Sequence, residues 1–296
     1  MRVLATIGFS FSAGVFLAAL LPWNGWQLYA AGGVLLLALA WLFAARKQKY
    51  FRRGLLLLLS LAVSLAYFAG YDHLVRQPIE DRCGAASDFA ATVCDWPQAT
   101  ERGARVTVEL EGYHRARAVL YGEAELLAAR PGDTVTGTAQ WQSAAHFDSD
   151  DVTHFNARGV YALLYGREDV RLSAGDGDAL RWLPQRAGKA FREKVAAIWD
   201  DPRVSGFLTA ELTGDKSAMD DGDYLAMQET GLAHLFAVSG LHCAFLVTLL
   251  ALLISRRQRL LCAVTIPLLL FYMVMVGMSP SVVRACIMQI FLLIAP

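Results

Sequence analysis

Long apolar runs near both ends of the chain enclose a polar middle. The runs cover residues 3–21, 28–45, 54–70, 232–254, 260–277 and 282–296. Most are long enough for a transmembrane helix, because about 20 residues at 1.5 Å per residue cross a hydrocarbon core of roughly 30 Å. The pattern predicts three membrane helices in residues 1–70 and a second membrane region in residues 231–296.

Within the polar middle, residues 71–176 alternate between apolar and polar positions. Such alternation is typical of half-buried β-strands, and the Gly, Pro and Asp between the runs indicate turns. The predicted strands are RVTVEL (105–110), RARAVLY (115–121), TVTGTAQ (134–140) and VYALLY (160–165). Several short strands in about a hundred residues predict a small β-barrel of the OB-fold type, and an SH3-like barrel would give much the same pattern.

Residues 177–230 are predicted to form helices and a charged loop. Apolar residues recur at helical spacing through residues 182–199, with basic residues on the other faces. A basic amphipathic helix is typical of the membrane interface, and packing on the barrel or on a neighbouring helix is the alternative. A short helix is expected at residues 204–212. The charged loop at 213–223, with Asp220, Asp221 and Asp223, favours a solvated helix start over a calcium loop, because it lacks the Gly and distal Glu placement of an EF-hand.

Two short loops rich in Lys and Arg indicate the orientation, because such loops stay in the cytoplasm. They are RKQKYFRR at residues 46–53 and SRRQR at residues 255–259. Both can be cytoplasmic only if the N-terminus is also inside and the barrel is outside. A cleaved signal peptide is the alternative for the first run, but its charged start is minimal and no clean cleavage site follows. The predicted fold class is an α-helical integral membrane protein with an inserted extracytoplasmic small β-barrel domain.

The balance of charge limits how the barrel can bind nucleic acid. Although the whole chain is neutral, residues 71–185 contain 11 Arg, no Lys and 18 acidic residues, a net charge of −7. This is the wrong sign for a general grip on a polyanion. A local contact remains possible on one predicted hairpin, where basic and aromatic side chains are close in sequence, and a solvated charged hairpin is the alternative. The DNA-contact candidates are Arg102, Arg105, Tyr113, Arg115 and Arg117, with Tyr121 nearby.

The cysteines divide between the two kinds of region. Cys83 and Cys94 fall in the predicted outer domain, where an oxidising environment permits a disulfide, and two unpaired thiols are the alternative. Zinc is disfavoured there because no CxxC motif or close His pair accompanies them. Cys243, Cys262 and Cys286 lie in apolar runs and are expected to be small buried side chains.

Polar residues interrupt the apolar character of the segment GLAHLFAVSGLH, residues 231–242. Polar groups inside a membrane are costly, so they are expected to serve a function or to bridge helices. Ser239 and His242 are three residues apart and share a helix face, whereas the glycines allow close backbone approach or a break in the helix. Arg284, in the last apolar run, is expected in the same cavity or at the outer surface. The channel-lining candidates are Gly231, His234, Ser239, Gly240, His242 and Arg284.

The segment LTGDKSAMDDGDYLAMQETGLAHLFAVSGLH, residues 212–242, together with SPSVVRA at 279–285, resembles the ComEC family of competence proteins. FDSDDVTHFNARGVYA, residues 147–162, resembles the end of that family's extracytoplasmic OB-fold domain. The resemblance implies an inner-membrane channel that imports single-stranded DNA during natural transformation. It implies single-stranded DNA, membrane lipid, other uptake proteins and further copies of the chain as partners.

The sequence departs from the family in its C-terminal region. Many members continue through more membrane helices and end in a metallo-β-lactamase-like domain, whereas this sequence ends in an apolar run, which suggests a fragment. None of its six histidines lies in an HxHxDH pattern, so we expect no metal, no cofactor and no enzyme activity from these residues. The alternatives to a channel component are a membrane scaffold whose barrel binds a protein or envelope polymer, and an intramembrane hydrolase using Ser239 and His242.

Overall fold

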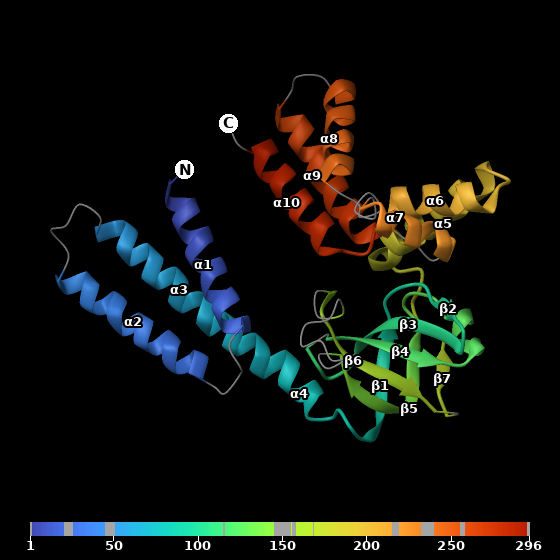
Figure 1. Ribbon diagram of the computed structural model, residues 1–296, viewed down its shortest axis with the longest axis horizontal. Coiled ribbons are helices and arrows are strands. Elements are labelled where there is room, and N and C mark those ends of the chain that lie inside the picture. Colours follow the sequence, from blue (N-terminus) through green and yellow to red (C-terminus); the bar gives the residue numbers. More distant parts are fainter. Residues whose placement is uncertain are drawn as a thin grey trace. The chain divides into compact units, whose positions relative to one another are not determined.

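The computed structural model describes residues 2–20, 26–44, 51–114, 116–144, 155, 158–167, 169–214, 219–231, 240–254 and 258–294. The chain divides into two compact units, Met1–Asp81 and Arg82–Pro296. The first unit is helical, and the second contains a β-barrel followed by further helices (Figure 1). His234, Ser239 and Arg115, which the sequence predicts as functional residues, lie outside the described residues.

The first unit is built from α1 (Arg2–Leu20), α2 (Trp26–Ala44) and α3 (Phe51–Tyr71), with α3 packed against both other helices. Small and hydroxyl side chains let the helices approach closely. The Ser60 hydroxyl donates a hydrogen bond to the Ile7 carbonyl at 2.9 Å. Gly14 faces Ser64 so closely that a Cβ at position 14 would collide with the Ser64 side chain. Close approach of small residues is how helices associate where lipid surrounds them.

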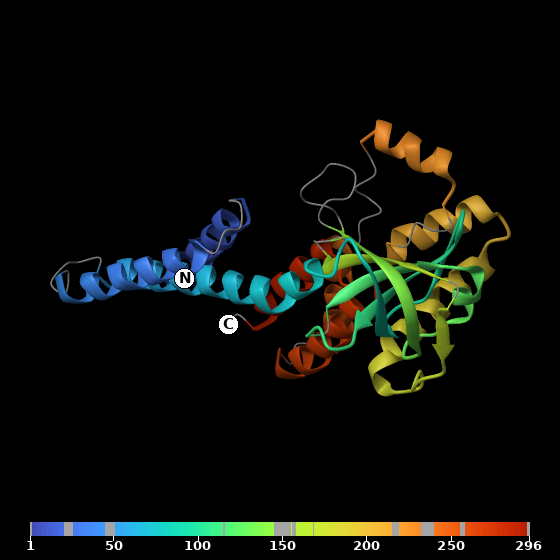
Figure 2. The same cartoon turned by 90° about the horizontal axis from the view of Figure 1, so that it is seen from below.

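The helix α3 continues beyond Tyr71 through a π-helical turn, η1 (Asp72–Arg76), into α4 (Gln77–Glu80). Figure 2 shows this continuous helical segment. The whole of Phe51–Glu80 counts as one apolar helix long enough to cross a membrane. Polar side chains at its end hold successive turns together, as described below.

The barrel strands are β1 (Ala86–Val93), β2 (Gln98–Thr100), β3 (Gly103–Leu110), β4 (Arg117–Gly122), β5 (Thr134–Ser143), β6 (Val160–Gly166) and β7 (Arg171–Ser173). In the ring, β1 pairs with β3, β3 with β4, β4 with β6, β6 with β5, and β5 again with β1. The β4–β6 pair is parallel and the others are antiparallel. This five-stranded ring, with the helical turn η2 (Ala124–Ala128) between β4 and β5, fits the OB type of barrel (Figures 1 and 2).

Alternation of apolar and polar residues gives the barrel its core, as the sequence predicts. Along β3, every second side chain from Ala104 to Leu110 is buried. Trp141 of β5 is only 1% exposed, and its indole Nε1 donates to the Ser87 carbonyl at 3.3 Å. The four predicted strands all lie in or overlap β3, β4, β5 and β6. The strand β1 is not among the predicted strands, because its small residues make the apolar pattern weak.

The disulfide predicted between Cys83 and Cys94 is not formed. The reason is the length of β1, which separates the two residues: eight extended residues span ~25 Å at about 3.3 Å each. A disulfide instead requires Cα atoms about 4.4–6.8 Å apart. The Cys94 thiol donates to the Thr92 carbonyl at 3.5 Å, and burial raises the pKa of this thiol to about 11.

After the barrel and the short η4 (Leu180–Trp182), the chain is helical. The helices are α5 (Leu183–Ile198), α6 (Pro202–Thr213), α7 (Asp221–Glu229), α8 (Gly240–Ile254), α9 (Gln258–Met275) and α10 (Pro280–Ile294). The Asp220 carboxylate caps α7 by accepting from the Asp223 amide, which agrees with the predicted helix start. Among the described residues no cluster of metal-ligating side chains is found.

The amphipathic helix α5 packs on the barrel and on a neighbouring apolar helix. This agrees with the predicted alternative to a position in the membrane interface. Lys189 lies 3.7 Å from the ring centroid of Trp96, whose indole donates to the Gln185 carbonyl at 3.1 Å. Gly188 lies against α9, where a Cβ would come within 3.0 Å of the Met275 carbonyl oxygen. The helix therefore connects the barrel with the end of α9.

Three described helices are long and apolar enough to cross a membrane: Trp26–Phe43, Phe51–Glu80 and Gln258–Met275. Three shorter apolar helices, Ala5–Ala19, Gly240–Ile254 and Pro280–Ile294, lie in the other predicted runs. The structure thus has a helix in each apolar run that the sequence analysis identifies.

Candidate nucleic-acid interface

A pocket of about 430 Å³ lies at the end of the barrel formed by the β3–β4 turn; we call it the barrel-end pocket. It is lined by Arg82, by residues 88–90 of β1, by residues 110–113 and by Trp141 of β5. Its volume falls within the range of about 300–1,000 Å³ that is usual for small-ligand sites. The pocket is therefore large enough for a small organic group.

The pocket opens where the pairing of β1 with β3 ends, while its pairing with β5 continues. Residues 91–93 of β1 pair with β3, whereas residues 86–92 pair with β5. The last backbone hydrogen bond toward β3 runs from the Glu111 amide to the Ala90 carbonyl at 2.9 Å. Beyond that bond β3 turns away, because Gly112 and His114 adopt positive φ angles of 81° and 46°. This turn places Glu111 and Tyr113 at the mouth of the pocket.

Two aromatic rings and one guanidinium group form the wall of the pocket. The Arg82 guanidinium carbon lies 5.3 Å from the Tyr113 ring centroid and 6.0 Å from that of Trp141. The two ring centroids are 5.9 Å apart, with an interplanar angle of 51°. Because Trp141 is almost wholly buried, Arg82 and Tyr113 present the accessible part of this wall.

Carboxylates line the rest of the mouth. Asp88 and Glu111 are both exposed members of the lining. Asp88 Oδ1 lies 3.1 Å from the Thr138 hydroxyl, which also contacts Asp169 at 2.6 Å. Hydrogen bonding from Thr138 lowers the pKa of Asp169. The described lining of the pocket therefore carries one basic side chain, Arg82, and two acidic side chains, Asp88 and Glu111.

The predicted DNA-contact residues do not form a single cluster. Arg102 and Arg105 lie at the β2–β3 hairpin, and Tyr113 lies beyond the other end of β3, ~25 Å away along an eight-residue strand. Arg105 is held by Gln98 Oε1, which accepts from its Nε and a terminal nitrogen at 3.0 and 2.8 Å. Arg117 pairs across the ladder with Glu109. Of this predicted set, Tyr113 lines the barrel-end pocket.

The channel-lining candidates are only partly described. Gly231, with φ of 73°, follows the end of α7, and Gly240 begins α8, where its added Cβ would be 3.9 Å from Ala285. His242 Nε2 lies 3.8 Å from Oε1 of Glu211 on α6. Arg284 is exposed on α10.

The contact between Glu211 and His242 was not found from the sequence. Glu211 lies about twenty residues before the polar segment 231–242. The two residues are on different helices, so no helical periodicity links them. Glu211 is the one charged residue in the segment 204–214, which otherwise consists of apolar, small and hydroxyl residues. This isolated carboxylate could have suggested a polar partner. Polar side chains in apolar segments usually lie close to a polar partner, so such a carboxylate indicates a polar neighbour elsewhere in the chain.

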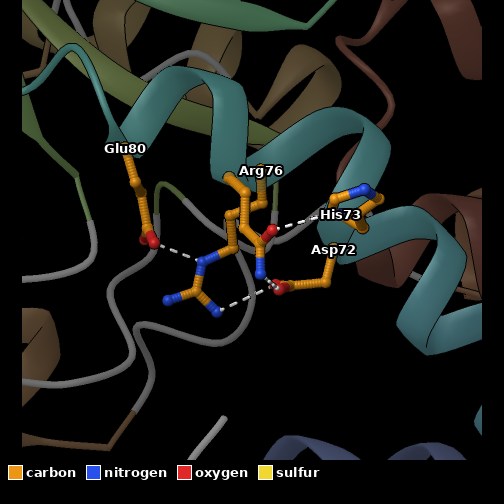
Figure 3. Close-up of polar contacts among 5 residues, drawn as sticks. Asp72, His73, Arg76 and Glu80 are labelled. Atoms are coloured by element: carbon orange, nitrogen blue, oxygen red, sulfur yellow. Dashed lines mark hydrogen bonds and ion pairs between the residues drawn. The ribbon is translucent and has the colours of Figure 1, made fainter. Parts of the chain in front are cut away.

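A cluster of polar side chains that the sequence analysis does not predict lies at the end of the long helix of the first unit (Figure 3). Arg76 Nε donates to Glu80 Oε1 at 2.8 Å, and its Nη1 lies 3.6 Å from Asp72 Oδ1. His73 Nδ1 is 2.8 Å from Gln77 Oε1. These contacts link side chains four residues apart, and such spacing could have been recognised. They stabilise the turns through which the chain leaves the apolar helix.

Comparisons with known proteins identify the class of the C-terminal region. A family model described as "Competence protein" matches residues 212–296. ComE operon protein 3 of Bacillus subtilis (strain 168) is 36% identical over 91 residues, which cover 30% of this chain and 12% of that relative. No solved structure matches. These matches confirm the resemblance of this region to the ComEC family of competence proteins.

Proposed function

We propose that this chain forms the membrane and OB-barrel portion of a channel that imports single-stranded DNA during natural transformation. The observation that carries the proposal is the match of residues 212–296 to the competence-protein family. The match to the relative covers 12% of that protein, so its activity is transferred here as a hypothesis. In this proposal the chain conducts DNA and performs no catalysis with its own residues.

Two features of the fold support a transport role. Apolar helices flank the barrel in sequence, and several are long enough to cross a membrane. The barrel is of the OB type, which commonly binds oligonucleotides and oligosaccharides. The basic loops at residues 46–53 and 255–259 favour a cytoplasmic N-terminus in the bacterial inner membrane, with the barrel outside. DNA would then meet the barrel before it reaches the helices.

The contact between Glu211 of α6 and His242 of α8 provides a specific polar site for the channel proposal. The Glu211 carboxylate beside His242 fixes a polar group at the beginning of α8, within the family-matched region. We expect this pair to position the His242 imidazole toward the translocated strand or its water. The partners in this proposal are single-stranded DNA, lipid, other uptake proteins and further copies of the chain.

The acidic barrel favours one alternative, a membrane scaffold that binds a protein or an envelope polymer. The net charge of −7 over residues 71–185 works against the capture of DNA by long-range attraction. A channel with such a barrel would have to receive DNA from a separate binding protein. The two functions therefore differ in whether the helices take part in DNA entry.

The test is uptake of labelled DNA by cells that carry the gene for this protein. We expect His242→Ala and Glu211→Gln to lower DNA entry into the cytoplasm about tenfold, because each removes one partner of the 3.8 Å contact. A tenfold change corresponds to about 1.4 kcal/mol. DNA bound at the cell surface should stay unchanged. Thr248→Ala is the matched control, since the Thr248 hydroxyl bonds to the Ala244 carbonyl of its own helix. Normal entry in both variants, at equal membrane abundance, would reject the channel role and favour the scaffold.

A further inference from the structure

The side chains of the barrel-end pocket indicate which kind of ligand it binds, a question that the channel proposal leaves open. Its accessible wall consists of a planar cation over an aromatic ring, and its mouth carries two carboxylates. This combination restricts the ligand by shape, by charge and by its hydrogen-bonding groups. Each restriction follows from the described side chains.

The charge at the mouth argues against a phosphate as the occupant. Asp88 and Glu111 would repel an anion, and within the described part of the chain Arg82 is the one basic residue of the lining. Carboxylates accept hydrogen bonds and donate none when ionised. The favoured occupant is therefore neutral and offers N–H or O–H donors.

The geometry of the wall favours a flat ligand over a sugar ring. Sugars commonly pack on an open aromatic face, but Arg82 already lies over the Tyr113 ring, and Trp141 is 1% exposed. The surface left for stacking is largely the plane of the guanidinium group. Unpaired nucleobases stack on such planes as well as on aromatic rings. A base is both flat and neutral, so it satisfies both restrictions.

The carboxylate beside this plane distinguishes among bases. Glu or Asp accepts a hydrogen bond from the N4 amino group of cytosine, whereas thymine has a carbonyl oxygen at the same position. One oxygen of Asp88 already contacts Thr138. Glu111 is exposed, and it follows β3 at the turn that forms the mouth. Glu111 is therefore the better placed acceptor for an exocyclic amine.

We propose that the barrel-end pocket binds one unpaired, amine-bearing nucleobase, stacked on Arg82 with its amino group donating to Glu111. This proposal rests on the proposed function, in which the barrel meets single-stranded DNA. It adds a preference for composition: a cytosine-rich strand binds more tightly than a thymine-rich one. Phosphates stay outside the pocket, so the acidic mouth does not prevent binding.

The experiment measures binding of labelled oligo(dC) and oligo(dT) of equal length to the full chain in detergent, by fluorescence anisotropy. The two probes carry the same backbone charge, so a difference between them reports the bases. We expect oligo(dC) to bind about tenfold more tightly than oligo(dT), as is usual for a good base-edge contact. Arg82→Lys keeps the charge but removes the plane, and should weaken the binding of both probes.

The variant Glu111→Gln distinguishes a specific hydrogen bond to the base from a general effect of the negative charge on binding. Gln can donate to the thymine carbonyl, so the preference should fall close to equal binding of the two probes. Glu101→Gln is the matched control: it removes the same charge from an exposed position on the β2–β3 turn and should keep the preference. Circular dichroism confirms that each variant keeps the fold.

Equal binding of the two probes by the unchanged protein would overturn the proposal, as would a preference that survives Glu111→Gln. Binding of an envelope oligosaccharide with no binding of either probe would overturn it in favour of a glycan site. The outcome is separate from the uptake test. A base preference without any effect of His242→Ala on DNA entry would reject the channel and keep the pocket, and the reverse result would reject the pocket alone.

Discussion

The barrel and the helices α8–α10 distribute apolar residues in opposite ways. In the barrel, large apolar side chains are inside: Trp141 is 1% exposed and Leu163 is 0% exposed. In the helices, many large side chains are outside, with Phe245 at 69% and Leu252 at 78%, although Leu269 and Leu293 are buried. Small or polarisable residues such as Cys243 and Cys286 are buried between them. The barrel has the pattern of a water-soluble domain, and the pattern of the helices fits a membrane protein.

The difference indicates that burial of side chains contributes to stability in a different way in each region. In the barrel, removing apolar surface from water provides the main stabilisation. Between helices in lipid this driving force is missing, because lipid tails are as apolar as the side chains. Close contact, as between the Cys243 and Cys286 sulfur atoms at 3.6 Å, replaces it. Substitutions should therefore act differently in the two regions.

The largest expected effect is at the barrel core. Trp141→Ala should lower the free energy of unfolding by about 3–5 kcal/mol, because it removes a fully buried aromatic side chain and leaves a cavity. Leu252→Ala on α8 should change it by less than about 0.5 kcal/mol in detergent, since this side chain is mostly exposed. Denaturant unfolding followed by circular dichroism measures both. Equal losses would contradict the contrast between the two regions.

A smaller effect is expected where the helices are closest. Ala285→Leu should destabilise the α8–α10 contact by about 1–3 kcal/mol, because the added atoms meet Gly240 and the neighbouring core. The readout is the yield of oxidative cross-linking between Cys243 and Cys286, identified by mass spectrometry. Met288→Leu, at an exposed position on α10, is the control and should leave the yield unchanged. An undiminished yield in Ala285→Leu would show that the helices are not closely packed there.

The smallest effect at neutral pH concerns Cys94. Burial, with the nearby Glu109 carboxylate, raises the pKa of this thiol from 9.0 to about 11. The folded state keeps the proton that the unfolded state releases above pH 9, so this contribution to stability is complete below pH 9. It is lost as the pH rises through 11. Alkylation of Cys94 should reach half its maximal rate near pH 11 in the folded protein and near pH 9 in denaturant. Equal profiles would contradict burial of the thiol in the barrel.

Local patterns predicted many of the elements because they depend on neighbouring residues. Period-two alternation identified β3, and long apolar runs identified the helices. The same reasoning failed for contacts between distant residues. It placed Arg102 and Tyr113 in one cluster, but an eight-residue strand separates them. It also left a disulfide between Cys83 and Cys94 open beside two separate thiols, and the structure, in which β1 separates them, agrees with the second alternative.

The sequence by itself determined the order of apolar and alternating segments, and with it the helices, most of the barrel strands and the family resemblance. These properties are local, since each depends on residues a few positions apart. Only the tertiary structure decided that Arg82, Tyr113 and Trp141 share one pocket, and that Glu211 lies beside His242. The physical reason is strand register and helix packing. Both bring together side chains whose separation in the sequence carries no periodic signal.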